Sequence, residues 1–174
     1  MQTPRRPFTF LLIVAGLCLP LTHAAAQPNA SSSESATEDL QIFHHTDLYF
    51  GEHIPIQEIP VHVDPQGDNA GLKKAGKFQV TGPPNQKVMI TVENETDLIN
   101  ETNESIPLTL DARGSKMDHQ QSADESVNNA QQVLLDPNEG AYWIWIGGDI
   151  VIEEDQPGGH YETTILVEVE EHLQ

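Results

Sequence analysis

Short runs in which apolar and polar residues alternate follow one another along the chain from about residue 40. Successive side chains of a β-strand point to opposite faces of its sheet, so this alternation is typical of strands with one buried face. Turn-forming residues separate the runs at 64–67, 82–85, 136–140 and 156–159. Many short strands divided by such turns predict an all-β sandwich or barrel of about seven to nine strands.

The alternation places seven candidate strands, at 40–42 leading into 48–50, and at 59–63, 78–80, 88–92, 106–110, 142–152 and 161–169. Pro60 has no backbone N–H to donate, which predicts that its strand lies at a sheet edge. The polar stretch 116–132 is expected to be a loop, with a short helix at the Ser122–Glu125 capping box as the alternative. The acidic, Asn-rich segment 93–104 carries three glycosylation sequons and is also predicted to be a solvent-exposed loop.

Residues 1–26 have the features of an export signal. Arg5 and Arg6 supply a positive start, and residues 8–21 form an apolar stretch that is too short to span a membrane. The small residues that follow predict cleavage after Ala26. The arginine pair also fits the twin-arginine route, but general secretion is expected because nothing downstream looks like a cofactor domain that must fold before export.

The exported chain is expected to consist of a leader and one domain. Residues 27–38 are Ser-rich and lack aromatic side chains, which predicts a disordered leader, and residues 39–174 are expected to form a single β-sandwich domain. Cys18 is the only cysteine, and Leu17 before it is larger than the residue that a lipoprotein processing site requires. We therefore expect a mature chain with no lipid, no cysteine and no transmembrane segment.

The charge of the chain excludes one large class of partner. There are 27 Asp plus Glu against 8 Lys plus Arg, and removal of Arg5 and Arg6 takes the formal net charge from −19 to −21. Nucleic-acid binders need a positive surface to neutralise phosphates, so no nucleic-acid partner is expected. Because much of the acid lies in loops and on outward strand positions, we interpret it as a solubility feature.

Several motifs, taken together and in order, resemble the bacterial domain of unknown function 4402 family. They are LYFG at 48–51, VHVDPQG at 61–67, KFQVTGPPN at 77–85, ITV at 90–92, IGGDIVI at 146–152, QPGGHY at 156–161 and ILVEV at 165–169. The resemblance implies a secreted, immunoglobulin-like antiparallel β-sandwich with a likeness to fimbrial subunits. It implies a place in the periplasm or on the surface of a Gram-negative bacterium, and it supplies no catalytic residues.

The run 142–152 contains the sharpest local feature of the chain. Tyr142 and the alternate isoleucines as far as Ile152 fall on one side of this strand, and Trp143 and Trp145 fall on the other. The β-branched side is predicted to face the core. Two interpretations of the tryptophans remain open. The indoles form an exposed binding face for sugar or protein, or the loop 116–132 covers them as a satellite apolar cluster.

Two acidic turns are candidate calcium sites. Asp64 and Asp68 lie in the first turn, and Asp136 and Glu139 lie in the second. Their side-chain oxygens are the hard ligands that calcium prefers, although neither turn has the spacing of a known calcium loop. Calcium is therefore an alternative, and otherwise no cofactor is expected.

The sequence offers little for catalysis. His53, His62 and Asp64 form a weak zinc alternative without paired ligand spacing, and there is no Gly-x-Ser-x-Gly elbow. We therefore expect a non-catalytic envelope or surface protein with a structural or adhesive, fimbrial-like role. The alternative is a carbohydrate- or calcium-binding module that uses Trp143 and Trp145 or the acidic loops. The expected partners are other envelope or fimbrial proteins, or surface glycans.

A fimbrial role would require strand exchange between subunits. The segment 39–46 follows the leader and is a candidate donor strand, with Leu40 and Ile42 as its apolar side chains. The strong closing run 161–170 indicates that the chain completes its own sheet, so a self-sufficient monomer is favoured.

Overall fold

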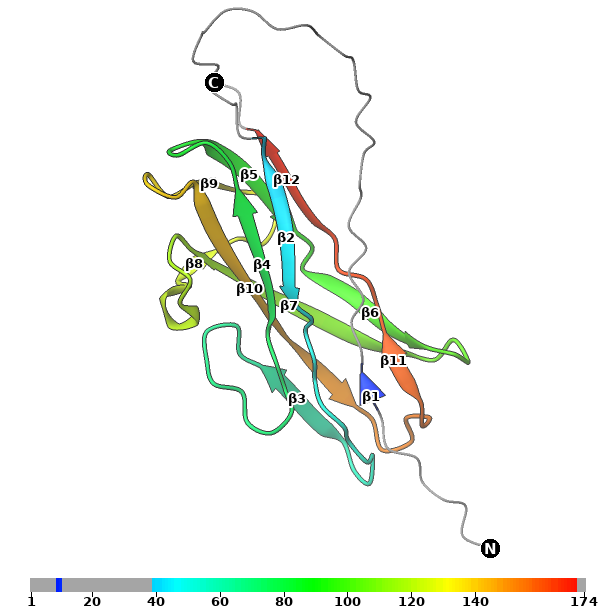
Figure 1. The fold of residues 1–174 in the computed structure, drawn as a ribbon. Coiled ribbons are helices and arrows are strands. Elements are labelled where there is room, and N and C mark those ends of the chain that lie inside the picture. The colour runs from blue at the N-terminus through cyan, green and yellow to red at the C-terminus, as the bar shows by residue number, and fades with distance from the viewer. Residues whose placement is uncertain (1–8, 11–38, 172–174) are drawn as a thin grey trace, which may run out of the picture.

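The computed structural model describes residues 9–10 and 39–171 of the chain (Figure 1). The expected leader 27–38 and the expected export signal, apart from Thr9–Phe10, lie outside these residues. Over the described residues the chain forms twelve strands and one 3-10 helix. This confirms the all-β sandwich, and the strands outnumber the expected seven to nine partly because three of them are only two or three residues long.

The larger of two sheets has nine strands in the order β1-β11-β6-β7-β10-β4-β2, with β3 paired to β10 and β8 paired to β7. Its pairs are antiparallel apart from β1 and β11. The strands are β1 (Thr9–Phe10), β2 (Gln41–Thr46), β3 (Ile59–Val63), β4 (Gly76–Thr81), β6 (Glu95–Asn100), β7 (Ser105–Ser115), β8 (Glu125–Ser126), β10 (Ala141–Ile152) and β11 (His160–Glu162).

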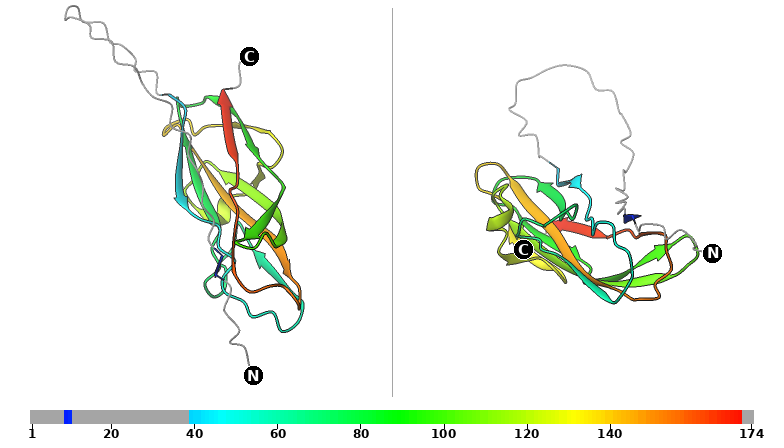
Figure 2. Two further views of the ribbon diagram at one scale, coloured as in Figure 1. Left: turned by 90° about the vertical axis from the view of Figure 1, so that its right-hand side faces the viewer. Right: turned by 90° about the horizontal axis from the view of Figure 1, so that it is seen from below.

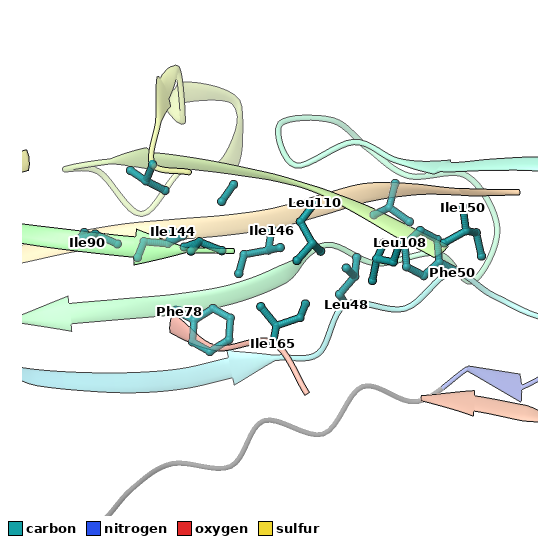
Figure 3. Packing of buried hydrophobic residues seen from close by; sticks show 14 of the residues in the cluster. Leu48, Phe50, Phe78, Ile90, Leu108, Leu110, Ile144, Ile146, Ile150 and Ile165 are labelled. Atoms are coloured by element: carbon teal, nitrogen blue, oxygen red, sulfur yellow. The ribbon is translucent and has the colours of Figure 1, made fainter. Parts of the chain in front are cut away.

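The smaller sheet covers part of the larger one. It has the order β12-β5-β9, from β12 (Val167–Glu171), β5 (Lys87–Val92) and β9 (Gln131–Leu134). Figure 2 shows β12 in a different layer from β2 and β4. Side chains from both layers form one apolar cluster, which includes Ile90 of the small sheet and Ile144 and Ile146 of the large one (Figure 3). Closing two half-apolar faces on each other removes both from water.

Strand β10 is the centre of the large sheet. It pairs with β7 along one side, and with β4 and then β3 along the other. The predicted inward residues are all at most 2% exposed: Tyr142, Ile144, Ile146, Ile150 and Ile152. Among the described strands β3 pairs only with β10, so the predicted edge position of Pro60 is confirmed.

The predicted single strand 161–169 is wrong. The chain forms β11 in the large sheet, leaves it, and then forms β12 in the small sheet. Ile165 lies between the two strands and is 1% exposed. The alternation of Tyr161, Ile165 and Val167 continues through the crossing, because both sheets bury the same face of this segment against the shared core. Periodicity reports the buried face and does not report the pairing partner.

The segment 93–104, predicted to be a loop, forms β6 and the hairpin into β7. Leu98 is 2% exposed, and Asn100 at the end of β6 is 7% exposed. The Asn100 Oδ1 accepts the backbone N–H groups of Thr102 and Glu104, each at 2.9 Å. The loop prediction therefore failed because two of the three inward positions of this strand, Thr96 and Asn100, are polar, and Asn100 takes its hydrogen bonds from the hairpin turn itself.

The stretch 116–132 is neither a plain loop nor an α-helix. It contains the three-residue 3-10 helix η1 (Gln120–Ser122), which ends where the capping box would begin a helix, and then β8 and the start of β9. Ala123 and Val127 are fully buried and hold this stretch to the domain. Near the start of the domain, the expected strand 48–50 is reduced to one bridge between Tyr49 and Lys74.

Candidate functional site

The face of β10 opposite the core carries the two tryptophans. On this outer face Trp145 pairs with Lys77 of β4 on one side and with Arg113 of β7 on the other. Trp143, one step along, pairs with Gln79 of β4 and Ser115 of β7 in the same way. Directly opposite residues of paired strands share a face, so these side chains form one cross-strand patch.

Trp143 is half-buried and is surrounded by polar and charged groups. The Lys77 Nζ lies 4.4 Å from the centroid of its ring, and the exposed His45 ring is 5.3 Å away, tilted by 39°. His45 in turn contacts the Gln79 side chain, with 3.2 Å between Nε2 and Oε1. A cation above the indole is attracted by the negative face of the ring. Part of the Trp143 ring is therefore open to solvent beside a fixed positive charge.

Trp145 is only 4% exposed. It lines an open cavity of about 250 Å³, together with Lys73, Lys74 and Lys77. The Lys77 Nζ is 5.7 Å from the Trp145 ring centroid, and its ion pair with Asp118 holds it in place.

The walls of the cavity beside Trp145 come from the loop between β3 and β4 and from η1. Residues 67–69 of this loop line the cavity, and Gln120 of η1 closes another side. The Gln120 Nε2 donates to the carbonyl oxygens of Pro65 and Gly67, at 3.0 and 3.1 Å, and so joins η1 to the loop. The sequence analysis considered only the stretch 116–132 as a cover for the tryptophans. That stretch supplies one side of the cavity beside Trp145, through Gln120.

Of the two candidate calcium residues in the first turn, Asp64 stabilises the turn itself. The Asp64 Oδ1 accepts the backbone N–H of Gln66 at 2.8 Å, and the Asp64 N–H donates to the Asn69 side chain. Asp68 is exposed and lines the cavity beside Trp145. This turn therefore reaches the tryptophan face, which its sequence alone did not indicate.

The second turn uses its carboxylate in the same way. The Asp136 Oδ1 accepts the backbone N–H groups of Asn138 and Glu139, at 2.8 and 2.9 Å. These hydrogen bonds stabilise the carboxylate and lower the pKa of Asp136. Among the described residues no group of three or more His, Cys, Asp or Glu side chains is placed to hold a metal ion.

The two histidines considered as zinc ligands, His53 and His62, have separate partners. The His62 Nδ1 lies 2.8 Å from the Asp149 Oδ1, its cross-strand neighbour on β10. The His53 Nε2 lies 2.8 Å from the carbonyl oxygen of Phe50.

Comparison with protein families agrees with the order of the motifs. Residues 40–170, which contain every element described above from β2 to β11 and all but one residue of β12, match the family model described as "Domain of unknown function (DUF4402)". The chain belongs to the DUF4402 family. The resemblance drawn from the motifs is thus confirmed, and the DUF4402 region contains the whole tryptophan face. A search of the curated proteins finds no match.

Sequence reasoning missed the lysines of the DUF4402 domain as site residues. Lys73, Lys74 and Lys77 lie within five positions of an acidic chain, which was the one available signal. Their convergence on Trp145 depends on the path of the loop between β3 and β4, which no local pattern specifies. The structure also contains no helix in its described part that is long and apolar enough to cross a membrane.

Proposed function

We propose that the protein is an exported, non-catalytic domain of the bacterial envelope or cell surface with a structural or adhesive role. The export features of residues 1–26 support secretion, and the family offers no catalytic residues. Contact with a partner is made through the outer face around Trp143. The partner is another envelope component, either a protein or a glycan.

The observation that carries this proposal is the environment of Trp143. A half-buried tryptophan stands on the outer face of the central strand, with the Lys77 ammonium 4.4 Å from its ring centroid. Tryptophan is enriched among residues that dominate binding energy, because its flat apolar ring and N–H lose little entropy on contact. The ion pair of Lys77 with Asp118 keeps the cation in place before any partner arrives.

Substitution Trp143→Ala is expected to weaken attachment to envelope fractions of the source bacterium by roughly tenfold or more, as for an interfacial hot spot. Attachment is measured by sedimentation of the purified chain with the fractions. Leu166→Ala is the matched control, because Leu166 is 58% exposed and lies outside the outer-face patch, between β11 and β12. Equal attachment of wild type and Trp143→Ala, with both proteins folded, would contradict the proposal.

A second candidate function, fimbrial strand exchange, is favoured by β2. Its first five residues are exposed, and Ile42 and Phe43 are 41% and 44% exposed. It forms the edge of the large sheet and pairs with β4 alone among the described strands. A strand with so little burial can leave its own sheet, and β4 would then accept a strand from another copy.

Strand exchange predicts larger species in size-exclusion chromatography of the chain that begins at residue 27. These species should be lost when residues 27–45 are removed, because that deletion takes away most of β2. The substitution Leu166→Ala, which leaves β2 intact, should change nothing. A monomeric elution of the chain that begins at residue 27, at every concentration tested, would exclude exchange and leave the adhesive role unaffected.

A further inference from the structure

We infer that the cavity beside Trp145 binds a carboxylated sugar, a uronic acid unit of a short acidic oligosaccharide. This inference rests on the proposed adhesive function and names the class of its ligand. The site comprises the three lysines, the loop residues 67–69 and Gln120, with Trp143 at its side.

Positive charge is concentrated at this cavity. After Arg5 and Arg6 of the expected signal are set aside, six basic residues remain in the chain, and three of them line the cavity. Three lysines and one carboxylate, Asp68, line the cavity, so its lining carries a net positive charge on an otherwise acidic surface and can attract an anion.

The three lysine ammonium groups differ in the bonds that they form within the protein. Lys77 is paired with Asp118. The Lys73 Nζ donates to the carbonyl oxygen of His62 at 2.8 Å, and within the described residues no carboxylate forms an ion pair with Lys73 or Lys74. Lys74 is exposed, and its backbone is held by two 2.8 Å hydrogen bonds to Tyr49. Its backbone is thus fixed by an isolated bridge just before β4, and its ammonium is available to a ligand carboxylate.

The polar groups of the same cavity suit the hydroxyls of a sugar. Asp68 offers acceptors. The amide N–H groups of Asn69 and Gln120 are used in hydrogen bonds within the protein, so these two side chains offer their amide oxygens as further acceptors. The partly open ring of Trp143 lies next to Lys77 and can pack against the apolar face of a pyranose. A volume of about 250 Å³ is somewhat below the range of typical small-molecule pockets, which fits one sugar unit and excludes a bulky ligand.

The overall charge of the chain favours a short acidic oligosaccharide over a long polyanion as the ligand. A net charge of −19 repels any long polyanion at distances beyond the cavity. A short acidic oligosaccharide experiences less of this repulsion, and salt near 0.15 M screens charges separated by more than about 8 Å. The lysines at the cavity act at shorter range and are screened less.

The test uses the purified chain with trigalacturonic acid as the probe, measured by isothermal titration calorimetry in about 0.15 M salt. The fully methyl-esterified trimer is the matched ligand control, because it keeps the rings and hydroxyls and loses the charge. We expect the acid to bind at least tenfold more tightly than the ester. Lys74→Gln should weaken binding of the acid about fivefold, and Lys87→Gln, on β5 of the other sheet, should leave it unchanged. Thermal unfolding of both variants checks that they fold.

Each other outcome overturns the inference. Equal binding of acid and ester would show that charge is not recognised, and equal binding of a short poly-glutamate would assign the site to an acidic peptide. Failure of trigalacturonic acid to bind, while attachment to envelope fractions still depends on Trp143, would overturn the ligand class and leave the adhesive function standing. If trigalacturonic acid fails to bind and Trp143→Ala also attaches to envelope fractions as well as the wild type does, both proposals are overturned.

Discussion

Gly147→Ala is expected to destabilise the domain by about 3 kcal/mol, near the upper end of the cost of overpacking. A Cβ atom at residue 147 would lie 2.1 Å from the carbonyl oxygen of Val63 and 2.6 Å from the Pro65 ring. Both obstacles belong to the end of β3 and its following turn, so relief requires the backbone to move. That movement would separate β3 from β10, because Val63 is the register partner of the next residue, Gly148.

Urea unfolding monitored by tryptophan fluorescence measures this effect. Gly159→Ala is the matched control, since the nearest atom to its added Cβ would be the Asn100 Nδ2 at 3.4 Å, an ordinary contact. We expect the control to change the free energy of unfolding by no more than about 1 kcal/mol. A loss below 0.5 kcal/mol for Gly147→Ala, on the order of an ordinary surface change, would show that β3 does not press on β10 as described.

The sequence was a good guide wherever a strand buries one full apolar face. Alternation located β3 at its observed bounds and β10 to within one residue, and it identified the inward face from Tyr142 to Ile152. Those residues face a large apolar core, so their apolar side chains alone predict a strand with one buried face. The edge position of β3 followed from the single missing donor of Pro60.

The sequence was a poor guide where a polar residue faces inward or where partners are distant along the chain. Strand β6 was missed because Asn100 satisfies its hydrogen bonds in its own hairpin turn. The crossing between β11 and β12 was missed because Ile165 keeps the alternation in phase.

The candidate site, too, was predictable only in part from the sequence. The common face of Trp143 and Trp145 followed from the two-residue period of a strand. The unequal exposure of the two tryptophans could not be predicted from that period, because it depends on which loops lie beside each ring. Residues 67–69 of the β3–β4 loop line the cavity beside Trp145, and Gln120 joins η1 to this loop through hydrogen bonds to Pro65 and Gly67, while Trp143 stays half-buried. Loop paths are decided by contacts between distant residues, which a local pattern does not record.

Tyr142→Ala is expected to cost about 3–5 kcal/mol, the usual range for removing a buried aromatic ring. Tyr142 has no exposed surface, and its ring fills the space in front of Gly114, where an added Cβ would lie 2.4 Å from the Tyr142 Cε1. Strand β7 leaves this space by having no side chain at residue 114, so Gly114 cannot fill the cavity that the substitution creates. Urea unfolding should show the loss, and a loss below 1 kcal/mol, on the order of an exposed site, would contradict the packing described.

Tyr142→Phe separates the hydroxyl from the ring. The Tyr142 O–H donates to the Glu125 Oε2 at 2.7 Å, and Glu125 is exposed, so the net loss near neutral pH should be about 1 kcal/mol. Burial raises the pKa of Tyr142 far above its ordinary value, and the hydrogen bond to Glu125 and the negative charges of Glu125 and Asp124 raise it further. The hydroxyl therefore stays protonated in the folded protein at a pH where an unfolded tyrosine ionises.

This difference in pKa gives the wild type a characteristic alkaline transition. Because the folded pKa lies above the unfolded value of about 10, the contribution of Tyr142 is complete below pH 10. Above pH 10 unfolding releases a proton, and stability should fall by about 1.4 kcal/mol per pH unit until the folded pKa is reached. Burial and Glu52 also raise the pKa of Tyr49, but that residue is present in both proteins. The stabilities of wild type and Tyr142→Phe should therefore converge within about one pH unit above pH 10 and then cross, with the wild type the less stable. Parallel curves would mean that the Tyr142 hydroxyl ionises as freely in the folded domain as in the unfolded chain.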